Sequence, residues 1–214
     1  MNKETKDVFD KIKNEVIYCH YHWQTYRQLF GTNESRIKIM NDTTPSVFLI
    51  LQDLFMDNIT LAISKLIDHA ETKGNKNLSL YLLLDLLENE IDVSSREKLI
   101  ALIEQLKGII KIFRDRRNKL IAHLDLKTAI GVKVEDKYLI SRKNVEDALA
   151  IISKFLNEIE LYFFDGESMY DEIIGFIGDD GTSLLINMAK AIAYDELVNQ
   201  KIITENLWQK YGQV

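Results

Sequence analysis

The chain has 214 residues, of which 46% are apolar, enough to fill the core of one large domain or of a domain with a small appendage. It contains one proline and nine glycines. This composition favours long helices over turn-rich β structure, so we expect an all-α fold. The net charge of −6 argues against non-specific binding of nucleic acid by the whole surface.

The single cysteine, Cys19, excludes an intramolecular disulfide, and the N-terminal residues include no apolar signal segment. Both features favour the cytoplasm. Polar residues such as Asp53 and Asn58 interrupt the most apolar stretch before it reaches eighteen consecutive apolar residues. We therefore expect no membrane span.

The first predicted element is an amphipathic helix that ends before Gly31. Its apolar residues recur at alternating steps of three and four, which places them on one face of a helix. They are Phe9, Ile12, Val16, Cys19, Trp23, Tyr26 and Phe30.

A second helix is predicted from Pro45 to about His69, because Thr44 suits an N-cap and Pro45 suits the first helical position. It is apolar on most sides, which predicts the central helix of a bundle. One line of polar residues follows it at helical spacing, namely Asp53, Asp57, Thr60, Ser64 and Asp68.

The following elements are predicted from caps and periodicity. A loop is predicted over 71–77, followed by a short helix from Leu78 to Glu88. A long helix then opens with a capping box from Ser94 to Glu97. Beyond it we predict a loop or hairpin over 125–140 and a helix capped by Ser141. Four glycines after Asp165 mark a change in composition. We predict one helical bundle over 1–165 and a helical extension over 166–214, with a helix from Thr182 to about Asn199 and a last short one from Thr204.

Basic residues concentrate in one part of this acidic chain. Between Arg96 and Lys127 there are nine basic and four acidic residues, a net charge of +5, so the rest of the chain carries −11. On a regular helix Arg117 falls at the centre of an apolar stripe made by Leu106, Ile109, Ile110, Phe113, Leu120, Ile121 and Leu124. Because an unpaired buried guanidinium is costly, we expect Arg117 to meet a carboxylate, a phosphate or a polar interface. The charge pattern alone favours a solvated basic face with one buried ion pair.

The string RNKLIAH, from Arg117 to His123, resembles the Arg-x4–6-His motif of the HEPN superfamily. Further stretches in the same order resemble the abortive-infection HEPN family of the AbiU type. They are WQTYRQLFG (23–31), LAISKLIDHAETKGNKNLSL (61–80), RRNKLIAHLDL (116–126) and GTSLLINMAKAIAYDEL (181–197).

The resemblance implies an antiparallel HEPN helical bundle that forms a homodimer, and a metal-independent endoribonuclease toxin that acts in phage defence, with RNA as substrate and an antitoxin protein as a possible partner. On a regular helix Arg117 and His123 lie about 120° apart, so a two-fold axis would bring copies from two subunits together. No metal or other cofactor is expected.

The residue types suit this chemistry. Histidine titrates near neutral pH and can move protons, and a guanidinium donates parallel hydrogen bonds to phosphate oxygens. We assign proton transfer to His123, stabilisation of the phosphorane to Arg117, and positioning to Asn118, with RNA binding by Arg116, Lys119 and Arg114. Arg116 also fits the spacing, so the sequence leaves open which arginine is catalytic.

Two alternatives stay open. The position of a tyrosine found two residues after the histidine in some HEPN toxins is Asp125 here, which either orients His123 or bonds the local backbone. The whole patch could also serve a non-catalytic module that binds an antitoxin, a protein partner or a nucleotide. Cys19 with His20 and His22, and the aspartates of the second helix, are better explained by packing and by a polar face than by metal binding.

Overall fold

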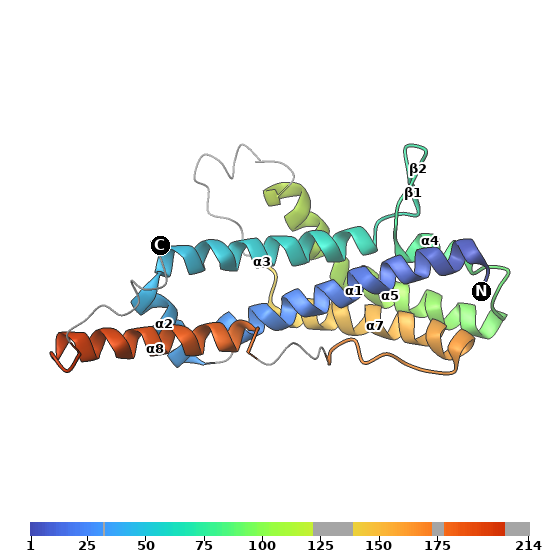
Figure 1. Cartoon of the computed structure of the whole chain (residues 1–214). Coiled ribbons are helices and arrows are strands. Elements are labelled where there is room, and N and C mark those ends of the chain that lie inside the picture. The colour runs from blue at the N-terminus through green and yellow to red at the C-terminus, as the bar shows by residue number, and fades with distance from the viewer. Residues whose placement is uncertain (32, 122–138, 173–177, 204–214) are drawn as a thin grey trace. The chain divides into compact units, whose positions relative to one another are not determined.

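The computed structural model describes residues 1–31, 33–121, 139–172 and 178–203. Within these residues the fold is all-α, as predicted, apart from one two-stranded hairpin, β1 (Glu71–Thr72) and β2 (Asn75–Lys76) (Figure 1). The described α-helices are α1 (Lys3–Phe30), α2 (Glu34–Thr43), α3 (Pro45–Leu66), α4 (Leu80–Leu86), α5 (Val93–Arg116), α7 (Arg142–Phe164) and α8 (Gly181–Asn199).

The chain forms two compact units. The first comprises Met1–Gln24 and Asp53–Ile174, and the second comprises Thr25–Gln52 and Gly175–Val214. The predicted boundary at residue 165 stays a prediction, because these units are defined by contacts, whereas a domain boundary concerns independent folding.

The first unit is a helical bundle in which α5 packs along α7 with the opposite chain direction (Figure 1). Its core includes Phe113 of α5 and Phe155 of α7, whose side chains are fully buried. The apolar stripe predicted for α1 is confirmed, since all seven of its residues are buried. Burial of that stripe explains why α1 is a helix, because each turn removes one or two large apolar side chains from water.

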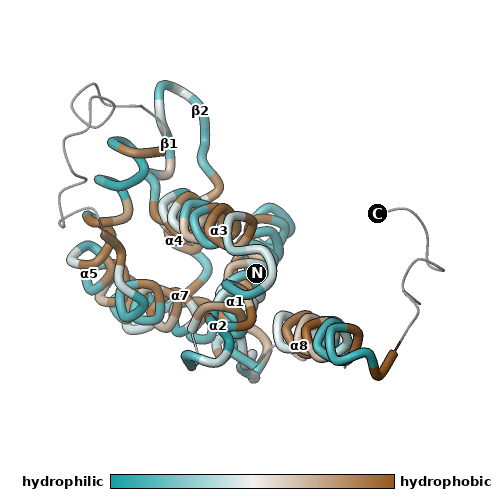
Figure 2. The backbone as a smooth tube through the Cα atoms, turned by 90° about the vertical axis from the view of Figure 1, so that its left-hand side faces the viewer, coloured by the Kyte–Doolittle hydropathy of each residue, from teal (hydrophilic) through white to brown (hydrophobic). Residues whose placement is uncertain are grey.

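The predicted central position of the second helix is wrong for its N-terminal half. The helix α3 begins at Pro45 as expected, but Val47, Leu49, Ile50 and Leu54 are exposed. Only 22% of its most apolar window is buried, and α3 is the one described helix long and apolar enough to cross a membrane by length and composition (Figure 2). Ile59, Ile63 and Leu66 in its C-terminal half are buried, so the uncovered apolar side chains lie in the N-terminal half.

Two predicted helix starts lie two residues too late. Asp92 caps α5 by accepting a hydrogen bond from the Ser95 backbone N–H at 2.8 Å, so the predicted Ser94 capping box is wrong. Likewise Asp180, not Thr182, caps α8. In both cases an aspartate stands just before the predicted cap and supplies a charged acceptor for the free N–H groups. The Ser141 cap of α7 is confirmed.

The second unit has a small core of its own. In this unit α2 packs on α8, and Gln28 of α1 accepts a hydrogen bond from the Gly181 backbone at 3.0 Å and donates one to Asp180 at 3.1 Å. A Cβ atom at Gly181 would lie 3.1 Å from the Cβ of Gln28, so the glycine permits this close approach. The helix α2 has no counterpart among the predicted elements, and its amphipathic pattern is weak.

Candidate functional site

The arginine-rich stretch changes helix type at the motif. The helix α5 ends at Arg116, and Arg117–Ile121 continue as a π-helical turn. A regular α-helix was expected here, so the predicted angle between Arg117 and His123 does not apply across this turn. Single π-helical turns are rare and occur frequently at functional sites. His123 and Asp125 lie outside the described residues.

Arg117 finds a carboxylate, as its place on an apolar stripe predicts. Its Nη1 atom lies 2.9 and 3.1 Å from the two carboxylate oxygens of Asp68, which follows the C-terminal end of α3. Its Nε donates to the side-chain oxygen of Asn118 at 3.2 Å. The side chain of Arg117 is 22% exposed, so the guanidinium is oriented by the protein and still reaches solvent.

Arg116 forms a separate ion pair. Its Nη2 donates to Asp57 of α3 at 2.8 Å, and its side chain is 16% exposed. The Nε of Arg116 is buried with no hydrogen-bond partner among the described residues. The structure therefore encloses Arg116 more than Arg117, although the two are adjacent in sequence.

Arg114 is bound to the backbone. Its Nη2 donates to the carbonyl oxygen of Ile67, in the turn that ends α3. The last carbonyls of a helix lack intrahelical donors, so this contact satisfies one of them. Of the residues predicted to bind RNA, only Lys119 is exposed and free of a salt bridge within the described chain, and Asn118 is exposed beside it.

These contacts reduce the positive charge that the sequence predicts for the basic stretch. Two members of the predicted polar line, Asp57 of α3 and Asp68 beyond its C-terminal end, neutralise two arginines of the basic stretch. The sequence signal for these partners was their regular spacing, but the pairing spans 59 and 49 residues. The apolar stripe is buried at Leu106, Ile110 and Phe113 and only half-buried at Leu120 and Ile121.

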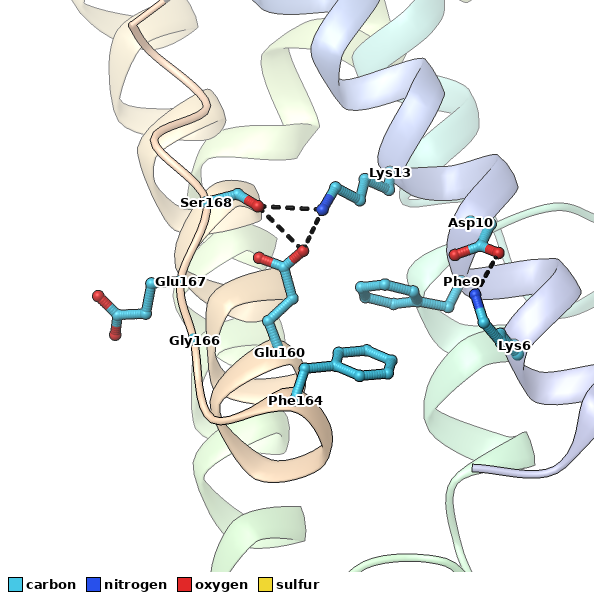
Figure 3. Close-up of a pocket in the computed structure, with 9 residues that line it drawn as sticks. All are labelled: Lys6, Phe9, Asp10, Lys13, Glu160, Phe164, Gly166, Glu167 and Ser168. Carbon is cyan, nitrogen blue, oxygen red and sulfur yellow. Dashed lines mark hydrogen bonds and ion pairs between the residues drawn. The ribbon is translucent and has the colours of Figure 1, made fainter.

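A second polar cluster lines a cavity of about 330 Å³ in the first unit. There Lys13 and the Ser168 hydroxyl converge on one carboxylate oxygen of the buried Glu160 (Figure 3). Across the cavity, Lys6 pairs with Asp10 at 2.6 Å. No pattern in the sequence predicted this cluster. Because its lysines are already paired, the cluster ties residue 168 to α1 and α7 without leaving either lysine free for a ligand.

Two polar atoms of this region, one on Glu160 and one on Tyr170, are buried without a partner within the part of the chain that the structure describes. The second carboxylate oxygen of Glu160 and the hydroxyl of Tyr170 are buried without a hydrogen-bond partner in the described residues. Burial, together with the negative charge of Glu160, raises the pKa of Tyr170. Tyr170 therefore stays neutral and is not suited to proton transfer near neutral pH.

The residues considered for metal binding have other contacts. Burial, with a smaller contribution from Glu15, raises the pKa of the Cys19 thiol to about 12. The Nε2 of His20 lies 2.8 Å from the Ser153 hydroxyl, and the Nδ1 of His22 lies 2.9 Å from the Asn58 side-chain oxygen. Over the described ranges no group of three His, Cys, Asp or Glu side chains is arranged to hold a metal ion.

One comparison identifies relatives of this chain. The sequence profile of the HEPN family described as AbiU2 matches residues 2–181, which is most of the chain. No curated protein and no solved structure matches it.

Proposed function

The chain belongs to the HEPN family described as AbiU2, and from this premise we propose that it is an endoribonuclease toxin of abortive infection. It cuts RNA without a metal, as a homodimer, in the cytoplasm. The observation that supports this most is the state of Arg117: a guanidinium held in place at a π-helical turn, partly exposed, six residues before His123.

In the proposed reaction the ribose 2′-hydroxyl attacks the adjacent phosphorus. His123 accepts the proton of that hydroxyl while the bond from phosphorus to the 2′-oxygen forms. The bond from phosphorus to the 5′-oxygen then breaks. A protonated histidine, either the same His123 or His123 of the second subunit, returns a proton to the leaving oxygen. The products carry a 2′,3′-cyclic phosphate and a 5′-hydroxyl.

Arg117 stabilises the phosphorane in this scheme, because its N–H groups donate to the oxygens that gain negative charge. Asn118 positions Arg117 through the hydrogen bond to its Nε. Lys119 is exposed and binds the RNA backbone. Arg114 and Arg116 contribute to RNA binding only if they leave Ile67 and Asp57, their partners on the α3 side.

The homodimer is proposed from the same stretch. Leu120 and Ile121 stay half-exposed in the single chain, next to the partly exposed Arg117. A second subunit packed there along a two-fold axis covers these side chains and brings two motifs together. Light scattering that finds only monomer at tens of micromolar protein contradicts this arrangement.

The deciding experiment is cleavage of a labelled RNA by the wild type, by His123→Ala and by a matched control, His69→Ala, which changes an exposed histidine of the same unit. We expect cleavage that survives EDTA, is blocked by a 2′-deoxy nucleotide at the cut, and falls roughly 10²- to 10⁴-fold in His123→Ala alone. Activity that needs magnesium, or that persists in His123→Ala, contradicts the proposal.

The exposed apolar face of α3 favours one alternative, a non-catalytic module that binds an antitoxin or another protein. Val47, Ile50 and Leu54 are exposed and lie on that face, and contiguous exposed apolar residues commonly mark protein interfaces. This alternative predicts no RNA cleavage under any condition, and toxicity or partner binding that is lost on Ile50→Glu but kept in His123→Ala.

A further inference from the structure

The hydrogen bonds of Arg117 leave one edge of its guanidinium available. The group carries five N–H donors. Nη1 donates to Asp68 and Nε donates to Asn118, and no described residue accepts a hydrogen bond from Nη2. Arg117 is therefore held through Nη1 and Nε, and the N–H groups of Nη2 have no acceptor among the described residues.

The guanidinium of Arg116 binds a different carboxylate from that of Arg117. Its partner Asp57 lies nine residues before Leu66, the last residue of α3, and Asp68 lies beyond that end. At 1.5 Å per residue, the backbone of α3 rises about 13 Å from Asp57 to Leu66. The guanidinium groups of Arg116 and Arg117 therefore pair with two different carboxylates, and that of Arg116 is the more enclosed of the two.

The carboxylate of Asp68 has two opposing effects on a phosphate at the Nη2 edge. It restricts a long and otherwise flexible side chain to one orientation, which favours the reaction because the donors are already in place. It also adds a negative charge a few ångströms from the phosphate, which weakens binding of the RNA. A partner with only a structural role would not affect these two quantities in opposite directions.

We propose that Asp68 is a positioning residue for Arg117: it holds the guanidinium so that Nη2 faces the scissile phosphate, and it does so at some cost in RNA affinity. This inference rests on the proposed ribonuclease function. It also assigns the phosphate-facing role to Arg117 and leaves Arg116, with Asp57, as a structural pair.

The test measures kcat and KM separately for RNA cleavage by the full chain. Asp68→Asn keeps the shape but removes the charge, Asp68→Glu keeps the charge, and Asp53→Asn, as a control, removes an exposed charge from α3. We expect Asp68→Asn to lower kcat by about 10- to 100-fold, the scale of a slightly misplaced group, while KM stays equal or falls. Asp68→Glu should restore much of kcat, and Asp53→Asn should match the wild type.

The thermal midpoint is measured on the same samples, so that unfolding is not mistaken for lost positioning. A folded Asp68→Asn enzyme with the kcat of the Asp53→Asn control overturns the inference while the ribonuclease proposal stands. So does a kcat lost equally in Asp68→Glu, or a raised KM with unchanged kcat. If the wild type itself cuts no RNA, both proposals fail together.

Discussion

The salt dependence of RNA binding should reveal which cations of the basic stretch contact phosphate. Lys119 is exposed and forms no salt bridge with any other described residue, whereas Arg114 is bound to the Ile67 carbonyl. Each phosphate contact on a single strand contributes about 0.7 to the slope of log K against log salt. Lys119→Gln should therefore reduce the slope by about 0.7 for each Lys119 that contacts the strand, which is about 2.6-fold in affinity over a fourfold change in salt.

The assay is fluorescence anisotropy of a labelled, uncleavable 2′-O-methyl RNA between 50 and 200 mM potassium chloride. Lys154→Gln is the matched control, since Lys154 is exposed on α7, away from the motif. The slope should be unchanged in this control. If Lys119→Gln keeps the wild-type slope, or if Lys154→Gln reduces it equally, then RNA does not bind where the structure leaves this cation unpaired.

Three further predictions concern the scaffold. Phe113→Ala should lower the free energy of unfolding by about 3–5 kcal/mol in urea titrations, because the ring is fully buried; a loss below about 1 kcal/mol would mean that the core of the bundle is misplaced. Cys19 should resist iodoacetamide at pH 8 in the native state, because burial raises the pKa of its thiol to about 12, and rapid labelling would contradict its burial. The Ser183 backbone N–H holds the pKa of Asp180 below its usual value, so the stability that this cap provides is present above about pH 3.9 and is lost as the pH falls through the lowered pKa. Asp180→Asn should therefore flatten the acid dependence of the thermal midpoint, and an unchanged acid dependence would count against this cap.

The all-α fold and the starts of α3 and α7 were predictable, because they follow from local periodicity and from residues such as Pro45 and Ser141. The cap at Asp92 was missed because Ser94 and Glu97 fit the pattern of a capping box. The helix in fact begins two residues earlier, where Asp92 accepts a hydrogen bond from the Ser95 backbone N–H. The exposure of α3 was not predictable, since hydrophobicity alone does not tell whether another helix covers a face.

For the candidate site, the need of Arg117 for a carboxylate followed from its place among apolar residues, and this expectation is confirmed. The identity of that partner was not predictable, because Asp68 is 49 residues away and is brought near only by the packing of the bundle. The π-helical turn over 117–121 also lacks a sequence signal, since the pattern around it fits a regular helix equally well. His123 keeps its assigned role as a prediction.

The one-to-one matching of arginines and aspartates also constrains how this sequence can change over time. Replacing Asp57 alone leaves the enclosed charge of Arg116 without a counterion, and replacing Arg116 alone strands the carboxylate. Each single substitution should therefore be tolerated less well than the double substitution. Related sequences should keep or lose the two residues together. Asp68 and Arg117 differ in kind: if that pair also serves the reaction, a lineage that loses it should lose His123 as well, whereas loss of the Asp57 pair should leave His123 in place.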